Sequence, residues 1–513
     1  MAGRKRLLVT VAVALGIFLG ALDTTIVGTA MPTVIASLGG LSLYSWVFAS
    51  YMLTSTVAAP IFGKLSDLFG RKVLFVIAIA IFLTGSALCG GAQTMEQLIL
   101  FRGLQGIGGG GLFALAFTII GVVFSPLERP RLQGMMSAMW AIASIVGPTT
   151  GGFIVENLGW RWTFYVNLPI GIIPAALVLY ALPEQQQVSQ QRRQVDYAGA
   201  LLLAGGVVAL LLAVMAGGQA APWGSPYILS LFGAAVLLLA AFLWVERRSP
   251  EPMVPLHLFR NRVFSVTNGG NFLTGLALFG SASFIPLFVQ GVLGGSAMAA
   301  GAAVTPLSLG WPAGSVVGGQ LVNRIGYRRI SLIGTTLMTA GFYLLTSMGI
   351  RSEPAEVGRN VFIIGLGMGL IAPTLVVAIQ NNVGREYLGT ATSSVQFFRN
   401  IGGTLGVSVM GALMANVMYR EIAQAGRTGQ LNGVAGTLGQ QLANPQLLMQ
   451  ADTRSQLPVA VLQVMQNGLA QALHGVFLLG LFALAAGVLL AFLMPDSTPA
   501  ADMARERTAA YKH

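Results

Sequence analysis

Three ionisable residues, Asp23, Arg102 and Arg399, lie inside long apolar stretches of this 513-residue chain. A charged side chain at the centre of a bilayer costs about 2.5–3.5 kcal/mol on insertion scales, so such residues are candidates for function. Asp23 could bind and release a proton if its neighbours change as the protein moves, because burial favours a neutral carboxyl group and a nearby guanidinium favours a charged one. The alternative is a structural role, in which the carboxylate caps a bend beside Thr24 and Thr25.

Arg102 is the expected partner of Asp23, because the two residues fall at compatible depths in their apolar stretches once the reach of the arginine is counted. Gln105 follows one helical turn later and suggests a polar interior face. Alternatively, Arg102 extends outward to the membrane surface. Arg399 has no obvious acidic partner. It could face a cavity, contact a carbonyl group, bind an anionic group of a substrate or serve a structural role.

Membrane helices are the elements that would position these residues. Hydrophobic residues make up 55% of the chain and charged residues 9%, whereas a soluble protein has about 25% charged residues. The composition excludes an ordinary soluble enzyme, and it excludes a disordered chain. A membrane helix needs about 20 apolar residues, and fourteen stretches qualify, near 7–36, 45–63, 73–91, 97–121, 132–155, 163–182, 196–216, 227–245, 264–289, 300–322, 330–349, 360–381, 390–418 and 470–494.

The distribution of charge predicts the orientation of these helices. The chain carries 29 Lys and Arg against 17 Asp and Glu, a net charge of +12. If the N-terminus is cytoplasmic, most basic residues fall in cytoplasmic loops, as the positive-inside rule requires. We therefore expect both termini in the cytoplasm and no nucleic-acid partner. A single cysteine, Cys89, and three well-separated histidines predict neither a disulfide nor a metal site.

An internal repeat indicates two related halves. The segments Gly63–Lys72 and Gly319–Arg328 share the pattern G-x-L-x-(D/N)-x-x-G-x-(R/K) and follow the second and tenth stretches. Repeated bundles with a substrate path between them are common in secondary transporters. The fold we expect is an all-α integral membrane protein of two pseudo-symmetric six-helix bundles with two extra helices between them. Its predicted parts are a first bundle at 1–185, the two extra helices at 186–262, a second bundle at 263–495 with a long outer loop at 419–469, and a cytoplasmic tail at 496–513.

Four further motifs accompany this repeat. They are Leu22-Asp23-Thr24-Thr25-Ile26-Val27 ending at Pro32, Leu98-x-x-x-Arg102-x-x-Gln105-Gly106-x-Gly108-Gly109, Gly134 with Gly147-Pro148-Thr149-Thr150-Gly151-Gly152, and Trp160-Arg161-Trp162-x-Phe164-x-x-Asn167-x-Pro169. In this order, and over nearly the whole chain, they resemble the fourteen-helix drug:proton antiporter group of the major facilitator superfamily. Ala143 departs from the pattern, since that group usually has another glycine there. The resemblance implies a proton-transfer role for Arg102, and the Gly147–Gly152 motif accompanies exporters in the family.

Two groups of residues are candidates for controlling conformational change. Glycines and a proline near residue 147 make a smooth helix face that could slide against 227–245 or a helix of the second half. The alternative is that this face serves only for plain helix packing. Asp67 and Arg71 could close the cytoplasmic side by pairing with a helix N-terminus and with an acid such as Glu128. The alternative is that this loop only holds the second and third helices in register. The second repeat has Asn323 and Tyr327 instead, which predicts a weaker latch or none. The complete set is Gly63, Asp67, Gly70, Arg71, Glu128, Gly147, Pro148, Gly151 and Gly152.

Aromatic and amide residues on the apolar helices are candidates for a substrate cavity, although each could equally pack or face lipid. The set is Trp46, Gln105, Trp140, Asn268, Asn271, Phe284, Gln290, Gln396, Phe397 and Arg399. Together with the family resemblance, these features predict a monomeric, multi-pass protein of a bacterial inner membrane. The resemblance implies that it exports lipophilic cations by alternating access in exchange for protons. No cofactor beyond the proton gradient is expected, and the expected partners are a small amphiphilic substrate, protons and the bilayer.

Two alternatives remain open at this point. The same fold could export a lipid, a siderophore or another amphiphilic metabolite, and Arg399 is the best support for that reading. The second alternative is a receptor that does not transport. An enzyme is disfavoured because no cluster of His, Cys or carboxylates is present, and a primary pump is disfavoured because Gly63-Lys64 lacks the rest of a phosphate-binding loop.

Overall fold

The computed structural model describes residues 3–40, 43–183, 195–218, 221–427, 448, 458–502 and 504. Within these residues every long element is a helix. Twelve of the described helices are long and apolar enough to cross a membrane. A further helix, α12 (Ala297–Thr346), is 50 residues long and is divided by the non-helical backbone of Gly326. The chain is therefore a multi-pass membrane protein.

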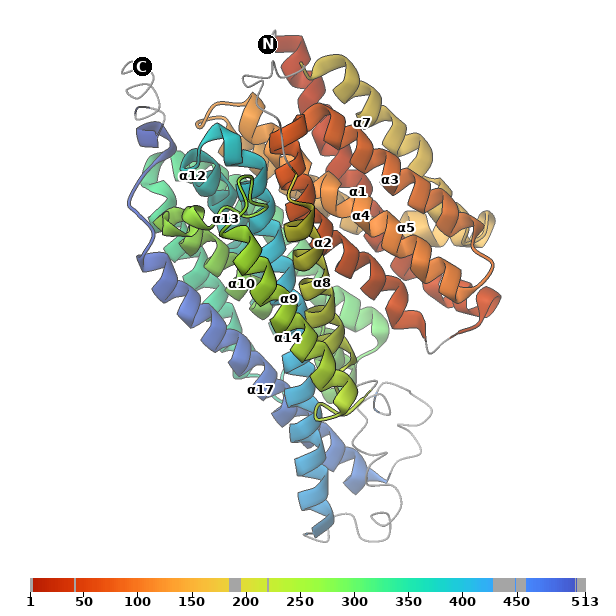
Figure 1. Cartoon of the computed structure of the whole chain (residues 1–513). Coiled ribbons are helices and arrows are strands. Elements are labelled where there is room, and N and C mark those ends of the chain that lie inside the picture. Colours follow the sequence, from red (N-terminus) through yellow and green to blue (C-terminus); the bar gives the residue numbers. More distant parts are fainter. Residues whose placement is uncertain are drawn as a thin grey trace.

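The first half of the chain packs around its own core. The buried side chains of Val13, Phe75, Phe82 and Leu112 belong to one apolar cluster within this half. Its helices are α1 (Gly3–Leu38), α2 (Tyr44–Phe69), α3 (Arg71–Gly91), α4 (Met95–Val123), α5 (Arg129–Asn157), the short α6 (Trp162–Tyr165) and α7 (Asn167–Ala181). In Figure 1 this half runs from red to yellow.

The second half forms a separate core, in which Phe288, Met338, Phe342 and Phe477 are buried. Besides α12, its elements are η2 (Leu256–Arg260), α10 (Arg262–Ala282), α11 (Ile285–Leu287), η3 (Phe288–Val292), α13 (Pro354–Asn381), η4 (Arg385–Tyr387), α14 (Leu388–Arg427) and α17 (Val459–Phe492). The range predicted as an outer loop, 419–469, includes helical residues at both ends, because α14 continues to Arg427 and α17 begins at Val459. The rest of that range lies outside the described residues, apart from residue 448.

Two helices, α8 (Tyr197–Ala216) and α9 (Pro226–Glu246), lie between the halves in sequence. In the cluster that α8 joins, Val207 and Leu211 share apolar contacts with Val57 of α2 and with Phe397 and Ile401 of α14. Thus α8 contacts both halves and covers the line where α2 meets α14 (Figure 1).

The repeated loops are built alike. Gly70 and Gly326 hold corresponding motif positions and have φ of 94° and 85°, values that glycine adopts much more readily than other residues. Gly63 and Gly319 also correspond, and each faces the opposite half. A Cβ atom on Gly63 would lie 2.1 Å from Ser393 Oγ, and one on Gly319 would lie 2.5 Å from the Pro130 carbonyl oxygen. The two repeats therefore make equivalent close contacts across the interface between the halves.

One end of the bundle carries both ends of the described chain, and we call it the terminal end. Arg6 at the start of α1 pairs with Glu128 at the start of α5, Nη1 to Oε1 3.2 Å. Asp502 accepts a hydrogen bond from Tyr327 Oη at 2.9 Å. Figure 1 shows the start of α1 and the short helical turn near residue 500 at the same end of the molecule.

Candidate functional site

Asp23 is completely buried within the first half. Arg102 Nη1 donates to its Oδ2 at 2.6 Å, while Gln105 Nε2 and Asn167 Nδ2 each donate to its Oδ1 at 2.8 Å. Both carboxylate oxygens are therefore occupied by donors from α4 and α7. A proton arriving at Asp23 has to compete with Arg102 for the same carboxylate.

Glycines of α4 explain how these side chains come together. A Cβ atom on Gly106 would lie 2.5 Å from the Tyr51 carbonyl oxygen, and one on Gly110 would lie 2.1 Å from the carbonyl oxygen of Ser55. The close approach of α2 brings the Tyr51 ring centroid to 4.3 Å from Arg102 Cζ. This distance allows a cation–π interaction, so the Tyr51 ring stabilises the Arg102 guanidinium.

Asn167 links the buried carboxylate to α3. Its Nδ2 also donates to Ser86 Oγ at 3.0 Å, and Ser86 Oγ donates to the Phe164 carbonyl oxygen at 2.8 Å. The sequence placed Asn167 in a motif but did not assign it a role, and it did not single out Tyr51 or Ser86. Asn167 and Ser86 do share one recognisable signal, since each is a polar residue in an otherwise apolar helix.

A cavity of about 360 Å³ lies between the two halves. It is lined by side chains from α1, α2, α4, α5, α10, α12, α13 and α14. Aromatic residues form much of its wall, and Phe113 and Trp140 of the first half are in contact, with ring centroids 5.6 Å apart. Among the lining residues that the structure describes, Arg399 is the charged one. Asp23 is not in the lining, although its neighbour Thr24 is.

Of the predicted cavity residues, Trp140, Gln396 and Arg399 line this cavity. Gln105 belongs instead to the Asp23 network, Phe397 packs in the cluster with α8, and Phe284 lies in the core of the second half. Asn268 and Asn271 are buried on α10, where Asn268 Oδ1 accepts from Ser394 Oγ and Asn271 Nδ2 donates to the Thr267 carbonyl oxygen. Trp46 and Gln290 also lie outside the lining. Helical periodicity groups residues on one face, but it does not say which neighbour that face meets.

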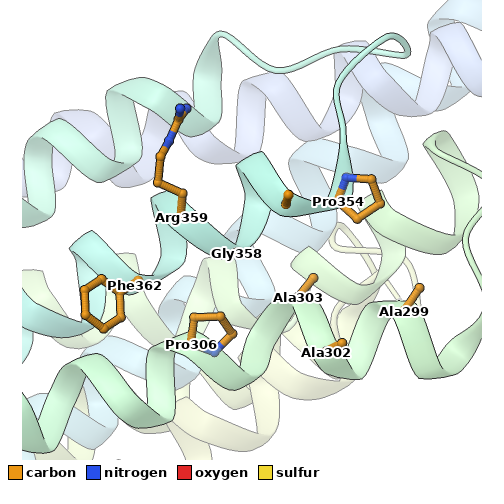
Figure 2. Close-up of a pocket in the computed structure, with 9 residues that line it drawn as sticks. Ala299, Ala302, Ala303, Pro306, Pro354, Gly358, Arg359 and Phe362 are labelled. Carbon is orange, nitrogen blue, oxygen red and sulfur yellow. The ribbon is translucent and has the colours of Figure 1, made fainter.

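A second hollow, of about 530 Å³, lies between the beginnings of α12 and α13. Figure 2 shows small residues around it, among them Ala302, Ala303 and Pro306, while the Arg359 side chain extends away from them. Arg359 Nε donates to Asn360 Oδ1 at 3.2 Å. Few polar side chains line this hollow, so the central cavity is the better candidate for a binding site.

The halves are joined at the terminal end by Asp67. Its oxygens accept from the backbone N–H groups of Gly389 and Thr390, both at 2.8 Å, at the start of α14. Arg71 Nη2 donates to Asp67 Oδ1 at 2.7 Å and to the Arg385 carbonyl oxygen at 3.1 Å. A carboxylate at a helix N-terminus satisfies free N–H groups and interacts favourably with the helix dipole. Asp67 therefore ties α2 to the first turn of α14.

The second repeat makes its own connection at this end. Asn323 Nδ2 donates to the Leu127 carbonyl oxygen at 3.2 Å. Arg129 Nη1 donates to the Gln380 carbonyl oxygen at 3.1 Å and also bonds Asn381 Oδ1. Asn381 Nδ2 in turn donates to Tyr327 Oη at 2.7 Å. A second seal is thus present, built from amides, an arginine and a tyrosine in place of the Asp67 carboxylate.

Glu128 has a different partner from the one expected. It pairs with Arg6 rather than with Arg71, because α1 begins beside the loop between α4 and α5. The backbone N–H and hydroxyl of Ser125 donate to Glu128 Oε2 at 2.9 and 2.8 Å. These two hydrogen bonds and the Arg6 guanidinium lower the pKa of Glu128 below its ordinary value of 4.5.

The glycine face of α5 meets α1, not 227–245 and not a helix of the second half. A Cβ atom on Gly147 would lie 2.0 Å from Thr25 Oγ1, and one on Gly151 would lie 2.2 Å from Thr29 Oγ1. Gly152 faces open space. The α5 residue that approaches the second half is Gly134, where a Cβ atom would lie 2.9 Å from the Ser315 carbonyl oxygen. The motif therefore brings α5 against the segment of α1 that follows Asp23.

Two related halves around a membrane cavity are the architecture of a secondary transporter. The model of the Major Facilitator Superfamily matches residues 13–196 and 190–407. The chain belongs to this family, and it is a transporter rather than an enzyme.

Relatives cover almost the whole chain. The multidrug transporter protein MdtP of Bacillus subtilis is 40% identical, over 96% of this chain and 93% of its own length. Multidrug resistance protein 3 of the same organism is 37% identical, over 92% of each. Among solved structures, the human organic anion transporter MFSD10 has a TM-score of 0.60 at 16% identity, covering 94% of this chain and 99% of that one. The proton:xylose symporter XylE has a TM-score of 0.57 at 15% identity, covering 94% and 95%. At such identities these two structures establish likeness of fold alone.

Proposed function

We propose that this protein is a proton-coupled antiporter that exports small lipophilic compounds by alternating access. The observation that carries the proposal is the buried Asp23–Arg102 ion pair beside a largely apolar cavity. The two Bacillus relatives named as multidrug proteins support export of drug-like cargo. We further propose fourteen membrane spans, a monomer with both termini in the cytoplasm of a bacterial cell, and no cofactor beyond the proton gradient.

The proposed cycle uses the Asp23 network as its switch. A proton entering from outside the cell neutralises Asp23 and frees Arg102 from its ion pair. Because Asp23 lies on α1 and Arg102 on α4, loss of the pair lets these helices move relative to each other. The α1 segment after Asp23 packs on α5, and α5 contacts α12 of the second half. This chain of contacts is the route by which protonation would reach the interface between the halves.

In this structure the hydrogen bonds described above between the halves lie at the terminal end. If that end is cytoplasmic, the conformation is closed toward the cytoplasm. Opening toward the cytoplasm then requires Asp67 to leave the first turn of α14, and Arg129 to leave Asn381. Deprotonation of Asp23 on the cytoplasmic side would reset the Arg102 ion pair and complete the cycle.

The charge of the cargo has two candidate answers. A lipophilic cation, expected from the sequence, would need the carboxylate of Asp23, which is buried here and fully occupied. An amphiphilic metabolite with an anionic group, the alternative cargo, is favoured by the presence of Arg399 in the cavity lining.

Transport by purified protein in proteoliposomes tests the proposed function. The probe is the primary amide of dansylated undecanoic acid, a neutral amphiphile, and an imposed pH gradient supplies the driving force. We expect the wild-type protein to move the probe against its concentration only when the gradient is present. Asp23→Asn should abolish this uphill movement, because Asn cannot exchange a proton, and full activity of this variant at normal reconstitution would remove Asp23 from the coupling role.

A further inference from the structure

We propose that the central cavity selects amphiphiles that carry a carboxylate, and that Arg399 is the residue that binds it. This inference deepens the proposed function and rests on it, since the cavity is taken as the transport site. It names the chemical class of the cargo, which the function as proposed leaves open between a cation and an anion.

The first argument is the incomplete bonding of Arg399. Its Nη2 group bonds the side-chain oxygen of Gln396, whereas its buried Nε has no hydrogen-bond partner. No carboxylate of the described residues lies within ion-pair distance of it, since the four ion pairs found there involve other residues. A guanidinium has five N–H donors and is costly to bury without a counter-charge. Arg399 therefore has both charge and donors left for a ligand.

The second argument is the rigidity of the backbone that holds Arg399. A Cβ atom on Gly275 of α10 would lie 2.2 Å from the Arg399 carbonyl oxygen, and Gly402 and Gly406 make equally close contacts with α10. These contacts fix α14 against α10 along this stretch. The site is thus carried by packed helices, which position a binding group more precisely than a loop does.

The third argument is the neighbourhood of the guanidinium. Gln396, Arg399 and Asn400 all line the cavity and lie on one face of α14. Gln396 Nε2 donates to Asn400 Oδ1 at 3.0 Å, so this amide helps to hold the polar face together. A carboxylate placed here could accept two parallel N–H bonds from the planar guanidinium, an arrangement that lysine cannot offer.

The fourth argument is the absence of an acid where a cation would need one. No Asp or Glu is present among the described residues that line the cavity. Trp140, Trp311 and Phe279 supply apolar walls, and a volume of about 360 Å³ falls in the range of sites for drug-sized ligands, roughly 300–1,000 Å³. Arg399 is the charged residue among the described lining residues, and it would repel a cation. An amphiphilic carboxylate satisfies both the walls and the guanidinium.

This assignment separates cargo from proton. The cargo anion is bound by α14 of the second half, while Asp23 and Arg102 of the first half remain available for the proton. The Asp23 carboxylate then binds only the proton, and the cargo does not have to compete with the proton for it.

Binding measurements with three matched probes test the inference. Dansylated undecanoic acid, its primary amide and the corresponding undecyl ammonium compound differ only in the head group. Each is titrated into wild-type protein in nanodiscs, with empty nanodiscs as the blank. We expect the carboxylate to bind most tightly and the ammonium compound most weakly. Arg399→Gln should weaken carboxylate binding about 10- to 100-fold, the size of a lost hydrogen bond to a charged group, and leave the neutral amide within about twofold.

Two further variants complete the design. Arg399→Lys keeps the charge but loses the planar fork, so it should give an intermediate loss. Arg359→Gln, which removes an exposed arginine outside the central cavity, should change nothing. The inference is overturned if the wild-type protein prefers the ammonium probe, or if Arg399→Gln keeps the carboxylate preference. If Arg399→Gln no longer binds the amide, the fold of this variant is affected. The inference is then tested by the order in which the wild-type protein binds the three probes and by the carboxylate affinity of Arg399→Lys. Uphill transport of the neutral amide tests the proposed function separately, so either idea can fail alone.

Discussion

At the scale of single residues, the Asp23 carboxylate is stabilised by further hydrogen-bond donors in addition to Arg102. Gln105 and Asn167 each supply a donor, and Tyr51 covers the guanidinium. The pair Asp23–Arg102 was predictable because charged residues in apolar stretches are rare and conspicuous. Asn167 and Tyr51 were not, since an amide or a phenol on an apolar helix is common and its direction depends on packing between helices.

Asn167→Ala tests whether the hydrogen bond from Asn167 to Asp23 matters for proton coupling. The change leaves the Asp23 carboxylate without one buried donor, which should lower proton-driven transport roughly tenfold, the equivalent of a lost hydrogen bond to a charged group. Asn157→Ala is the matched control, because that exposed amide bonds only the Phe153 carbonyl oxygen of its own helix. Initial rates in proteoliposomes give the comparison. Wild-type rates in Asn167→Ala would show that Asn167 is not required.

At the scale of helices, the sequence predicted where elements lie better than which surfaces they share. Both repeat glycines with positive φ, Gly70 and Gly326, stand at the positions the motif indicated. The face of α5 that was expected to slide against other helices packs on α1 instead. Likewise Gln396 and Arg399 line the cavity. Phe397, the residue after Gln396, lies about 100° further around α14 and packs in the cluster with α8. Periodicity defines such faces, but the packing of whole helices decides what each face contacts.

Gly147→Ala measures how tightly α5 packs on α1. A Cβ atom here would lie 2.7 Å from Thr25 Cβ, a contact that side-chain rotation cannot relieve. We therefore expect the variant to unfold at a lower temperature than wild type. Gly152→Ala, five residues along the same helix, meets nothing within 4 Å and should be unchanged or more stable by up to about 1 kcal/mol, because alanine is the better helix former. Thermal unfolding in detergent gives both values, and equal effects of the two changes would argue against a tight α1–α5 contact.

The Arg6–Glu128 pair gives the terminal end a dependence on pH. The pKa of Glu128 is lowered in the folded protein, so its stabilising contribution is complete above the ordinary value of 4.5 and is lost as the pH falls through the lowered pKa. Glu128→Gln should therefore unfold below the wild-type temperature at neutral pH, by a small amount because the pair is partly exposed. The difference should vanish in acid. A difference that persisted at pH values well below the lowered pKa would mean that Glu128 acts by something other than its charge.

At the scale of the whole molecule, two halves with separate cores meet along surfaces that are partly polar at the terminal end. Separate cores allow each half to move as a unit, while the hydrogen bonds of Asp67 and Arg129 can be exchanged for hydrogen bonds to water when the terminal end opens. The two helices α8 and α9 add a further constraint, since α8 touches α2 and α14 together. A rocking motion of the halves must therefore carry α8 along with one side or let it slide.

The proposed topology makes a sharp prediction because every loop depends on the number of spans before it. With fourteen spans, the connections at Gly349 and Gly384 lie on opposite sides of the membrane, the first outside and the second in the cytoplasm. Alkaline phosphatase, which folds actively only outside the cytoplasm, should be active when fused after Gly349 and inactive after Gly384. Green fluorescent protein, which does not fluoresce when it is exported unfolded, should be dark when fused after Gly349 and fluorescent after Gly384. The readouts at Gly349 and Gly384 reveal the absence of one of the two helices α8 and α9 from the membrane, but not the absence of both. One missing span would exchange the two readouts, whereas loss of both would preserve them, so a third fusion at Gly224, between α8 and α9, is needed. When Gly349 and Gly384 give the predicted readouts, phosphatase activity at Gly224 indicates that both helices cross the membrane, and inactivity at Gly224 would reduce the count to twelve.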